Sequence, residues 1–377
     1  MSDLRARIDQ GMWDVLQRYG FDEAQLLRLQ SDVREGRLSA ERNRVTGRVE
    51  PPAEGDVISL PAMGEQRRQE AYDAGSAAIR DGAVAMAVLN GGMATRFGGV
   101  VKGIVEAVDG RSFLEWKLID ANRTASALGG RVPCVIMNSF ATEPATREYL
   151  ATARAREPTI AQPIQFSQYV SLRLNRDGSL FLEEDGWPSL YAPGHGDFLI
   201  ALRRSGTLRL LQGHGIRYVM LSNVDNLGAR IDPVVIGAHV LNARPITVEV
   251  APKAAGDAGG APARVNGRMM HVEGFRFPPD FDQDSIPVFN TNSFVFDLDA
   301  LDQEFPLSWF YVEKSIDGQA AVQLERLVNE LTSFLPSTFL TVPRAGLHGR
   351  FFPVKAPEDL EAGRPALRAM LATSVVG

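Results

Sequence analysis

The segment Ala83–Gly103, AVAMAVLNGGMATRFGGVVKG, constrains the fold of this chain more than any other stretch. Its apolar run Val84–Leu89 shows no polar alternation, which is typical of a strand buried on both faces of a sheet. The glycines that follow let the backbone approach a ligand closely with its N–H groups free. Arg96 and Lys102 add two positive charges to the same loop. We therefore expect an anionic ligand, such as a phosphate chain, at the end of this strand; a glycine turn inside an α/β core is the alternative.

Two common phosphate-binding loops do not match this segment. The dinucleotide fingerprint G-x-G-x-x-G fails because Ala94 stands where the second glycine belongs, and this disfavours an NAD-dependent dehydrogenase. The P-loop pattern fails because no Gly-Lys-Ser/Thr follows. The remaining pattern is G-G-x-A-T-R-F-G-G-x-x-K, which needs the rest of the chain to interpret.

Composition excludes several classes of protein. The chain has 377 residues and a net charge of −6, so no general affinity for nucleic acid is expected and phosphate binding must come from local cations. Its single cysteine, Cys134, lies in the apolar run Val132–Met137, which predicts a buried strand residue and a reducing compartment. No apolar signal segment opens the chain and no apolar run reaches the roughly 20 residues that span a bilayer. We expect a cytoplasmic protein without a membrane or nucleic-acid partner.

The order of predicted elements indicates an α/β fold. Buried strand candidates alternate with helices, which predicts a mostly parallel, mixed central sheet covered by helices on both faces. Residues 1–80 are predicted as a helical N-terminal extension that buttresses the rest, residues 81–310 as the catalytic domain, and residues 311–377 as its C-terminal part. The strands expected with most weight are Val84–Leu89, Val132–Met137, Tyr218–Leu221 and Ile246–Val250.

Other local patterns predict turns, further helices and short strands. Hairpins are expected at Asp177-Gly178 and Asn266-Gly267. The prolines of Glu50–Pro61 predict an irregular connector, and the spacing of Gln319–Phe334 predicts an amphipathic helix. Further helices are expected at Arg111–Leu128 and Asp197–Gln212, and short strands at Phe339–Val342 and Phe351–Val354.

Several polar residues lie where ligands bind in such sheets, beyond the C-terminal ends of the strands. Asp225, in L-S-N-V-D-N, is either a Mg²⁺ ligand or a turn cap. His195, in Y-A-P-G-H-G-D, either meets a phosphate or is structural. The amide of Gln168 matches the imide edge of uracil but is ambiguous alone.

Two further segments carry candidate side chains. The asparagines of F-N-T-N at Phe289–Asn292 either bind sugar hydroxyls or begin a turn. Lys355, in F-F-P-V-K, is either a solvated strand end or a phosphate clamp, and Arg350 precedes it by five residues.

Taken in order, these segments resemble the UTP–glucose-1-phosphate uridylyltransferases of the eukaryotic type, also called UDP-glucose pyrophosphorylases. The stretch Tyr72–Gly92 is also similar to the UDP-N-acetylhexosamine pyrophosphorylases. The resemblance covers roughly residues 83–360, and its blocks are L-N-G-G at 89–92, V-P-C-V-I-M-N-S-F-A-T at 132–142, Q-F-S-Q…L-R-L at 165–174, P-G-H-G-D at 193–197, S-N-V-D-N-L-G at 222–228, F-N-T-N at 289–292, Q-L-E at 323–325 and R-F-F-P-V-K at 350–355.

The resemblance implies a Rossmann-like nucleotidyltransferase that forms a UDP-sugar and pyrophosphate from UTP and a sugar 1-phosphate, with glucose 1-phosphate favoured and Mg²⁺ as cofactor. The nucleophile is a phosphate oxygen that is already ionised at neutral pH, so no general base is needed. The implied roles are nucleotide binding by Leu89, Asn90, Gly91, Gly92, Gln168 and Gly194, sugar-phosphate binding by His195, Asn223, Asn292 and Arg350, catalysis by Lys102, Lys355 and Arg96, and metal binding by Asp225.

The chain departs from the family pattern at four points. Ala94 replaces a usual glycine, the loop to Lys102 is one residue short with Val101 in place of a proline, and Ser293 replaces a second asparagine. The 377 residues leave no room for the C-terminal β-helix of eukaryotic members, so we expect a monomer or homodimer. Alternatives are a pyrophosphorylase for an N-acetylhexosamine or other hexose-like 1-phosphate, and a non-catalytic sensor of sugar nucleotides.

Overall fold

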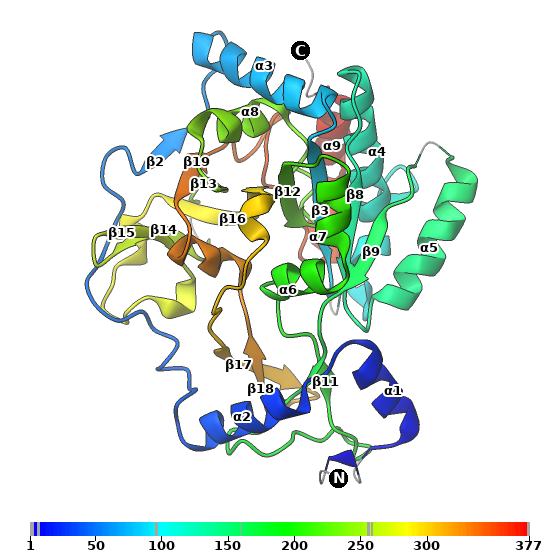
Figure 1. Cartoon of the computed structure of the whole chain (residues 1–377), viewed down its shortest axis with the longest axis vertical. Helices are drawn as coiled ribbons and strands as arrows, with labels where there is room; N and C mark the ends of the chain where they lie inside the picture. Colours follow the sequence, from blue (N-terminus) through cyan, green and yellow to red (C-terminus); the bar gives the residue numbers. More distant parts are fainter. Residues whose placement is uncertain are drawn as a thin grey trace.

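A mixed eight-stranded sheet forms the centre of the molecule (Figure 1). The computed structural model describes residues 4–5, 8–94, 97–158, 160–254, 257 and 259–374. All neighbouring strands are parallel except β16, which runs antiparallel to both of its neighbours. The predicted α/β class with a mostly parallel sheet is thus confirmed. Across the sheet the strands are β2 (Val57–Ser59), β19 (Ser337–Thr341), β13 (Ile246–Pro252), β16 (Val288–Asp297), β12 (Tyr218–Asn223), β3 (Val84–Asn90), β8 (Cys134–Asn138) and β9 (Ile164–Ser167).

The register of the sheet brings the ends of four strands to one edge. Every residue of β3 is buried, as the unbroken apolar run predicts. Leu89 of β3 pairs with Asn223 of β12, and Asn90 pairs with Asn138 of β8. Asn138 in turn pairs with Ser167, the last residue of β9. The loops that follow these strands therefore leave the sheet side by side.

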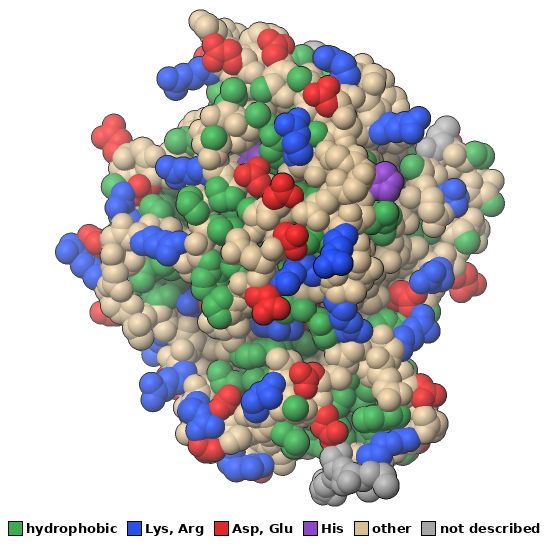
Figure 2. Space-filling view, viewed as in Figure 1, with side chains coloured by type: hydrophobic (Ala, Val, Ile, Leu, Met, Phe, Trp, Pro, Cys, Tyr) green, Lys and Arg blue, Asp and Glu red, His purple; other side chains and the backbone are tan. Residues whose placement is uncertain are grey.

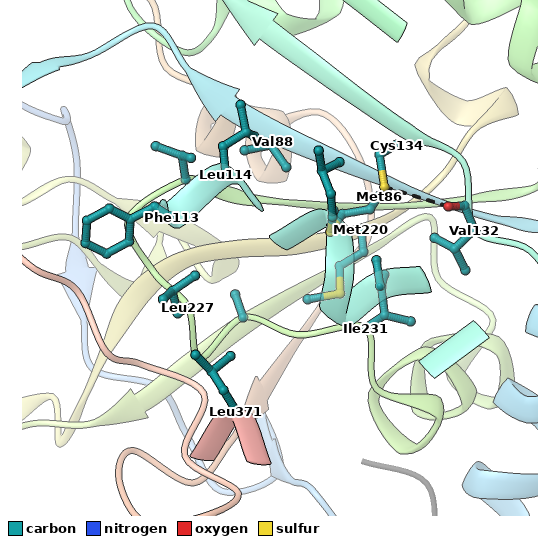
Figure 3. Close-up of a cluster of buried hydrophobic side chains, with 14 of the residues drawn as sticks. Met86, Val88, Phe113, Leu114, Val132, Cys134, Met220, Leu227, Ile231 and Leu371 are labelled. Carbon is teal, nitrogen blue, oxygen red and sulfur yellow. Dashed lines mark hydrogen bonds between the residues drawn. The ribbon is translucent and has the colours of Figure 1, made fainter. Parts of the chain in front are cut away.

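Two apolar cores cover the two faces of the sheet. One core, part of which is drawn in Figure 3, packs β3, β8 and β12 against helices, and the other lies on the opposite face. Helices on both faces were expected, and a β-hairpin adds to the second face. The first face carries α3 (Gln66–Arg80), α4 (Phe113–Ala127), α5 (Glu143–Arg156), α8 (Pro233–Asn242) and α9 (Pro357–Ala372); the second carries α6 (Asp197–Arg204), α7 (Thr207–Gly213) and the hairpin β14 (Ala261–Val265)–β15 (Arg268–Val272).

A third core belongs to a small lobe at the lower end of Figure 1. Leu16 and Leu26, from the two N-terminal helices, pack there against Leu172 and Val322. Gln168 and the Gly194-His195 segment lie on stretches of chain that connect this lobe to the sheet. The lobe comprises α1 (Gln10–Arg18), α2 (Glu23–Arg34), the pair β10 (Ser171–Leu172)–β11 (Leu190–Tyr191) and the hairpin β17 (Phe310–Ile316)–β18 (Gln319–Glu325).

The helix predicted over Gln319–Phe334 is wrong. Residues Gln319–Glu325 form β18, and only Val328–Ser333 are helical, as a 3-10 turn. The reason is the turn Asp317-Gly318, whose residues have φ of 49° and 81° and reverse the chain into a hairpin. Such a two-residue Asp-Gly turn between apolar segments is a strong hairpin signal, and it overrides the helical spacing that follows.

Three smaller expectations also need correction. The connector Glu50–Pro61 contains β2, which joins the edge of the central sheet beside β19. The helix expected over Asp197–Gln212 is broken into α6 and α7 at Gly206, whose φ is 76°. Residues Phe351–Val354 form no strand and contribute only a single bridge, between Asn226 and Pro353. A proline cannot donate to a strand ladder, which limits pairing there.

Two other predictions hold in part. The turn at Asp177-Gly178 is flanked by an isolated antiparallel bridge between Leu174 and Leu180 rather than by two strands, and the helix expected over Arg111–Leu128 begins at Phe113. Cys134 is buried in β8, and burial raises the pKa of its thiol to about 12. The turn Asn266-Gly267 joins β14 to β15. In the described part of the chain, no helix has the length and apolar character to cross a membrane. The short strands not yet named are β1 (Val49–Glu50), β4 (Met93–Ala94), β5 (Val100–Val101), β6 (Glu106–Val108) and β7 (Arg111–Ser112).

Candidate functional site

The glycine loop after β3 folds into a small hairpin. Its strands β4 and β5 pair antiparallel, and the backbone N–H of Lys102 donates to the carbonyl of Gly92 across 3.4 Å. Ala94 and Val101, two of the departures from the family pattern, lie in this hairpin. Arg96, which was assigned a catalytic role, lies outside the described residues. The hairpin thus sets Lys102 at the base of the loop, beside Gly92.

The ammonium of Lys102 meets the carboxylate of Asp225. The Lys102 Nζ to Asp225 Oδ2 distance is 2.5 Å, and the side chains are 19% and 17% exposed. The backbone N–H of Val224 donates to the carbonyl of Leu89 (3.1 Å), which fixes the Asp225 turn against the end of β3. A partly buried pair of opposite charges therefore stands at the ligand-binding edge of the sheet.

Two asparagines lie beside this pair. Asn292 Nδ2 donates to Asn223 Oδ1 across 2.9 Å, although the residues come from different strands. The backbone of Asn292 is left-handed (φ 55°), a conformation that asparagine tolerates, and it coincides with an irregular register between β13 and β16. Asn292 Oδ1 is buried and has no partner among the described residues. That oxygen is free to accept a hydrogen bond from a hydroxyl group.

Gln168 closes the other side of the glycine loop. Its backbone N–H donates to the carbonyl of Asn138 (2.9 Å), and a Cβ added to Gly91 would lie only 2.1 Å from its Nε2. Ser139 Oγ donates to the carbonyl of Gly91 across 2.9 Å. Gln168 Oε1 is buried without a partner within the described chain, so the amide retains an acceptor for a ligand. A side chain at Gly91 would therefore displace the Gln168 amide.

The loop around His195 packs on the chain that leaves β18. A Cβ on Gly194, whose φ is 91°, would lie 2.6 Å from the carbonyl oxygen of Arg326. A Cβ on Gly196 would lie equally close, 2.6 Å from the carbonyl carbon of the same residue. These glycines serve close backbone packing, rather than keeping the surroundings of His195 open. Asp197, fully buried at the start of α6, forms an ion pair with the Arg326 side chain and accepts from the N–H of Tyr169 (3.1 Å).

The ring of His195 has a defined tautomer. The backbone N–H of Val328 donates to its Nδ1 across 3.1 Å, so the proton of the neutral ring resides on Nε2. Desolvation lowers the pKa of this imidazole, with the nearby carboxylate of Glu273 acting in the opposite direction. His195 can therefore act as a neutral N–H donor near physiological pH.

The C-terminal cations divide into one exposed and one buried residue. Phe352 N–H donates to Asn226 Oδ1 (2.8 Å), and Pro353 bridges to Asn226, so the exposed Lys355 follows a segment that lies along the Asp225 turn. Arg350, only 2% exposed, pairs with both carboxylate oxygens of Glu249 at 2.5 and 2.8 Å. Its three guanidinium nitrogens are all engaged, which corrects the sugar-phosphate role assigned to it. Arg350 therefore supports the fold and has no guanidinium nitrogen left for a ligand.

Leu89 and Asn90 are the last two residues of β3, directly before the glycine loop. Leu89 is 8% exposed, and Asn90 is fully buried. The Asn90 amide donates to Asn138 Oδ1 (2.8 Å) and Thr146 Oγ1 (2.9 Å), so its side chain ties neighbouring elements together.

Sequence reasoning missed the buried polar groups behind the site. Lys117 donates to Ser222 Oγ (3.0 Å) and to the carbonyl of Ala229 (2.7 Å). A signal was present, because Lys117 follows Phe113 and precedes Ala121 at helical spacing on the buried face of α4. Glu249, the partner of Arg350, lies inside an apolar strand and carried a similar signal.

The donor set suits Mg²⁺ held largely by a substrate. Within the described residues, no group of three or more His, Cys, Asp or Glu side chains is arranged to hold a metal ion. Asp225 offers a single carboxylate, whose Oδ2 contacts Lys102. Mg²⁺ commonly takes one or two carboxylates together with phosphate oxygens and water, so a lone carboxylate beside a phosphate site fits this ion.

A comparison with models of known protein families shows the family to which this chain belongs. A family model described as UTP–glucose-1-phosphate uridylyltransferase matches residues 35–372. This chain belongs to that family. The UTP–glucose-1-phosphate uridylyltransferase of Astragalus penduliflorus is 31% identical over 291 residues, which cover 72% of this chain and 60% of that protein. The chain thus spans about three fifths of the length of such curated relatives.

Solved structures of the family and its relatives share the fold. A structure titled UDP-glucose phosphorylase from Trypanosoma brucei has a TM-score of 0.74 at 25% identity and covers 92% of this chain and 76% of that chain. A structure titled putative UDP-N-acetylglucosamine pyrophosphorylase from Entamoeba histolytica has a TM-score of 0.70 at 18% identity, covering 83% of this chain and 84% of that chain. At that identity the second likeness concerns the fold alone.

Proposed function

We propose that this uridylyltransferase-family chain catalyses the reaction of UTP with a sugar 1-phosphate, with glucose 1-phosphate preferred, to give a UDP-sugar and pyrophosphate. The observation that carries the proposal is the contact between Lys102 and Asp225 at the shared strand edge. A cation and a carboxylate in contact beside a glycine loop suit a phosphate chain and its metal ion. Residues 81–310 bind both substrates in this proposal, residues 311–377 contribute Lys355, and residues 1–80 act as a buttress.

Repulsion between two anionic substrates is the main obstacle to the reaction. Unit charges about 4 Å apart repel by roughly 4 kcal/mol at an effective dielectric constant near 20. The face in Figure 2 shows Lys and Arg side chains interspersed with Asp and Glu, so on that face the described residues offer no continuous basic surface to offset it. The positive charge must be local, and Lys102 and Lys355 are proposed to supply it. Arg96 is proposed to add to it.

Catalysis in this proposal is positioning and charge stabilisation. The attacking sugar phosphate is ionised at neutral pH, so none of the side chains has to remove a proton. Mg²⁺ bound to Asp225 supplies further positive charge to the phosphate oxygens. Lys102 holds the phosphates of UTP against the backbone of Gly91 and Gly92, and Lys355 stabilises charge that develops during transfer.

The remaining side chains select the substrates. The free Oε1 and the Nε2 of Gln168 match the donor and acceptor edge of uracil, with the backbone of Gly194 nearby in the same connecting region. Asn292 Oδ1 accepts from a sugar hydroxyl, and its amide contact to Asn223 fixes its orientation. His195 donates Nε2–H to the sugar phosphate. We further propose that the protein acts in the cytoplasm as a monomer or homodimer.

Pyrophosphate release from a panel of nucleoside triphosphates and sugar 1-phosphates tests the proposal. We expect the highest kcat/KM for UTP with glucose 1-phosphate. The variant Asp225→Asn should be nearly inactive, whereas Asp109→Asn, which breaks an exposed ion pair with Arg368, should behave as the unmodified protein. A higher kcat/KM for N-acetylglucosamine 1-phosphate would show that this sugar, and not glucose, is the substrate. Tight binding of UDP-glucose with no pyrophosphate exchange would make the chain a sensor and overturn the enzymatic proposal.

A further inference from the structure

Lys117 is a buried cation directly behind the Asp225 turn. Its residue is 3% exposed, on the face of α4 that packs against the sheet. Around it lie the apolar side chains of Met86, Leu227, Ile231 and Leu371, which are labelled in Figure 3. An ammonium group in such surroundings costs several kcal/mol of desolvation. Burial accordingly lowers the pKa of Lys117 to about 7.

The two hydrogen bonds of this ammonium join both ends of the turn. Ser222 is the residue before Asn223 in β12, and its Oγ accepts from Lys117 Nζ across 3.0 Å. Ala229 stands after Asp225 and Asn226, and its carbonyl accepts across 2.7 Å. One side chain therefore closes the loop of residues 222–229 from inside the core.

The carboxylates of Asp120, Asp225 and Glu249 favour the charged form of Lys117, but none of them is its hydrogen-bond partner. Asp120, one helical turn further along α4, is held by Arg230 in a bidentate pair at 3.0 and 2.6 Å. Glu249 is held in the same way by Arg350. The contacts of Lys117 are instead a hydroxyl and a carbonyl of the turn. Replacing Lys117 alone removes the cost of burying a charge but leaves the Ser222 hydroxyl and the Ala229 carbonyl buried without this donor.

We propose that Lys117 is a positioning residue for the proposed phosphate- and metal-binding turn, and that it fixes Asn223 and Asp225 by holding both ends of residues 222–229. This inference rests on the proposed function for its kinetic consequence. Its structural consequence, an ordered turn in the ligand-free protein, does not depend on any activity.

The variant Lys117→Met tests the inference because methionine keeps an unbranched apolar chain and removes the donors and the charge. Thr124→Val is the matched control, since Thr124 is also buried on α4, two turns away from the contact. In hydrogen exchange of the ligand-free protein, we expect faster exchange of the amides of residues 223–229 in Lys117→Met. The control and the amides of β3 should exchange as in the unmodified protein.

Kinetics give the second readout. We expect Lys117→Met to lower kcat by about 10-fold to 100-fold, as expected for misplacement of a group that stabilises charge, and to raise the Mg²⁺ concentration for half-maximal rate. Ser222→Ala, which removes one of the two contacts, should show a smaller change of the same kind and remains available if Lys117→Met does not fold.

The two proposals fail in different ways. Unchanged exchange and unchanged kinetics in both Lys117→Met and Ser222→Ala, with an active parent protein, would overturn the positioning role. A lower melting temperature with unchanged kcat would show that Lys117 only supports the fold. An inactive parent protein whose Lys117→Met variant still shows faster exchange of the turn would overturn the proposed function and leave the positioning role intact.

Discussion

Lys102 Nζ and Asp225 Oδ2 lie 2.5 Å apart although 123 positions separate the two residues in the sequence. The contact joins the hairpin after β3 to the turn after β12, the two loops that leave adjacent parallel strands. Without a ligand, each side chain neutralises the other. A phosphate chain with a divalent cation would compete for both charges at once, so the pair is a preorganised but exchangeable site.

Removing either member of this pair should abolish most activity. We expect Lys102→Ala and Asp225→Asn each to lower kcat by at least about 100-fold, the scale of losing one preorganised electrostatic contact. The double variant should lose less than the product of the two single effects, because the groups act on the same phosphates. Near-normal turnover by Asp225→Asn would contradict its assignment as the metal ligand.

The two C-terminal cations should respond in opposite ways. Lys355→Ala should lower kcat by about 100-fold with little change in melting temperature, because the exposed side chain contributes to charge stabilisation and not to the core. Arg350→Met leaves Glu249 buried without its partner and should destabilise the fold by about 3–5 kcal/mol. Thermal unfolding and initial rates measured on the same preparations separate these effects. An unstable Lys355→Ala or a stable Arg350→Met would reverse our assignment of the two residues.

His195 should contribute a neutral hydrogen bond rather than a charge. Since desolvation lowers its pKa, the ring stays uncharged above its ordinary titration range. His195→Ala should therefore reduce kcat/KM by only about 3- to 10-fold, the value of one neutral hydrogen bond. Rates measured from pH 6.5 to 8.5 should show the same profile in the variant and the parent protein. A loss as large as that of Lys102→Ala would show that the imidazole carries charge during the reaction.

Much of the fold and the choice of site segments could be predicted from the sequence. The unbroken apolar run of Val84–Leu89 and its glycines identify the central strand and its loop, because a strand buried on both faces has no polar alternation. Asp225 is placed near that loop by the rule that parallel strands end at one edge, whereas Gln168 was chosen for its amide chemistry and by the family resemblance. The contact of Asn223 with Asn292 was not predictable, since it depends on a local irregularity between β13 and β16.

The errors share a physical cause. Local spacing does not report which distant segment a residue meets. Arg350 follows a loop and precedes Lys355, so its charge suggested that it binds the ligand. In the structure it instead forms an ion pair with the buried Glu249 of a distant strand. The Gln319–Phe334 segment has helical spacing, but the turn before it and the pairing with β17 make it a strand. Lys117 was overlooked because its partners lie on β12 and its turn, not on its own helix.

Close packing around Gly91 gives a prediction about base selection. A Cβ at this position would lie 2.1 Å from Gln168 Nε2, so the amide must move in Gly91→Ala. We expect the KM for UTP to rise by about 10-fold or more and discrimination between UTP and CTP to weaken, because a displaced amide no longer matches the uracil edge. A Cβ at Gly92 would meet no atom of the described residues within 4 Å, so Gly92→Ala should preserve discrimination. Equal loss of discrimination in both variants would remove Gln168 from the base site.

A buried histidine, close enough to His195 to lower that residue's pKa, gives the protein a specific sensitivity to acid. His271 of β15 is 1% exposed, and desolvation, reinforced by Arg276, lowers its pKa to about 3. The unfolded chain binds a proton at this histidine near pH 6.5, and the folded chain does not. Above pH 6.5 the histidine therefore does not lower the free energy of unfolding. It falls by about 1.4 kcal/mol per pH unit from this group as the pH drops towards 3.

Replacing His271 should therefore flatten the stability profile in acid. Chemical unfolding of His271→Leu between pH 7 and 4 should show a weaker decline than the parent protein, whatever its stability at pH 7. His214→Leu, which removes an exposed imidazole at the end of α7, controls for the loss of a histidine as such. Because the other carboxylates and histidines remain in both proteins, their contributions cancel in the difference. Parallel profiles for His271→Leu and the parent protein would show that the buried ring is protonated without cost to the folded state.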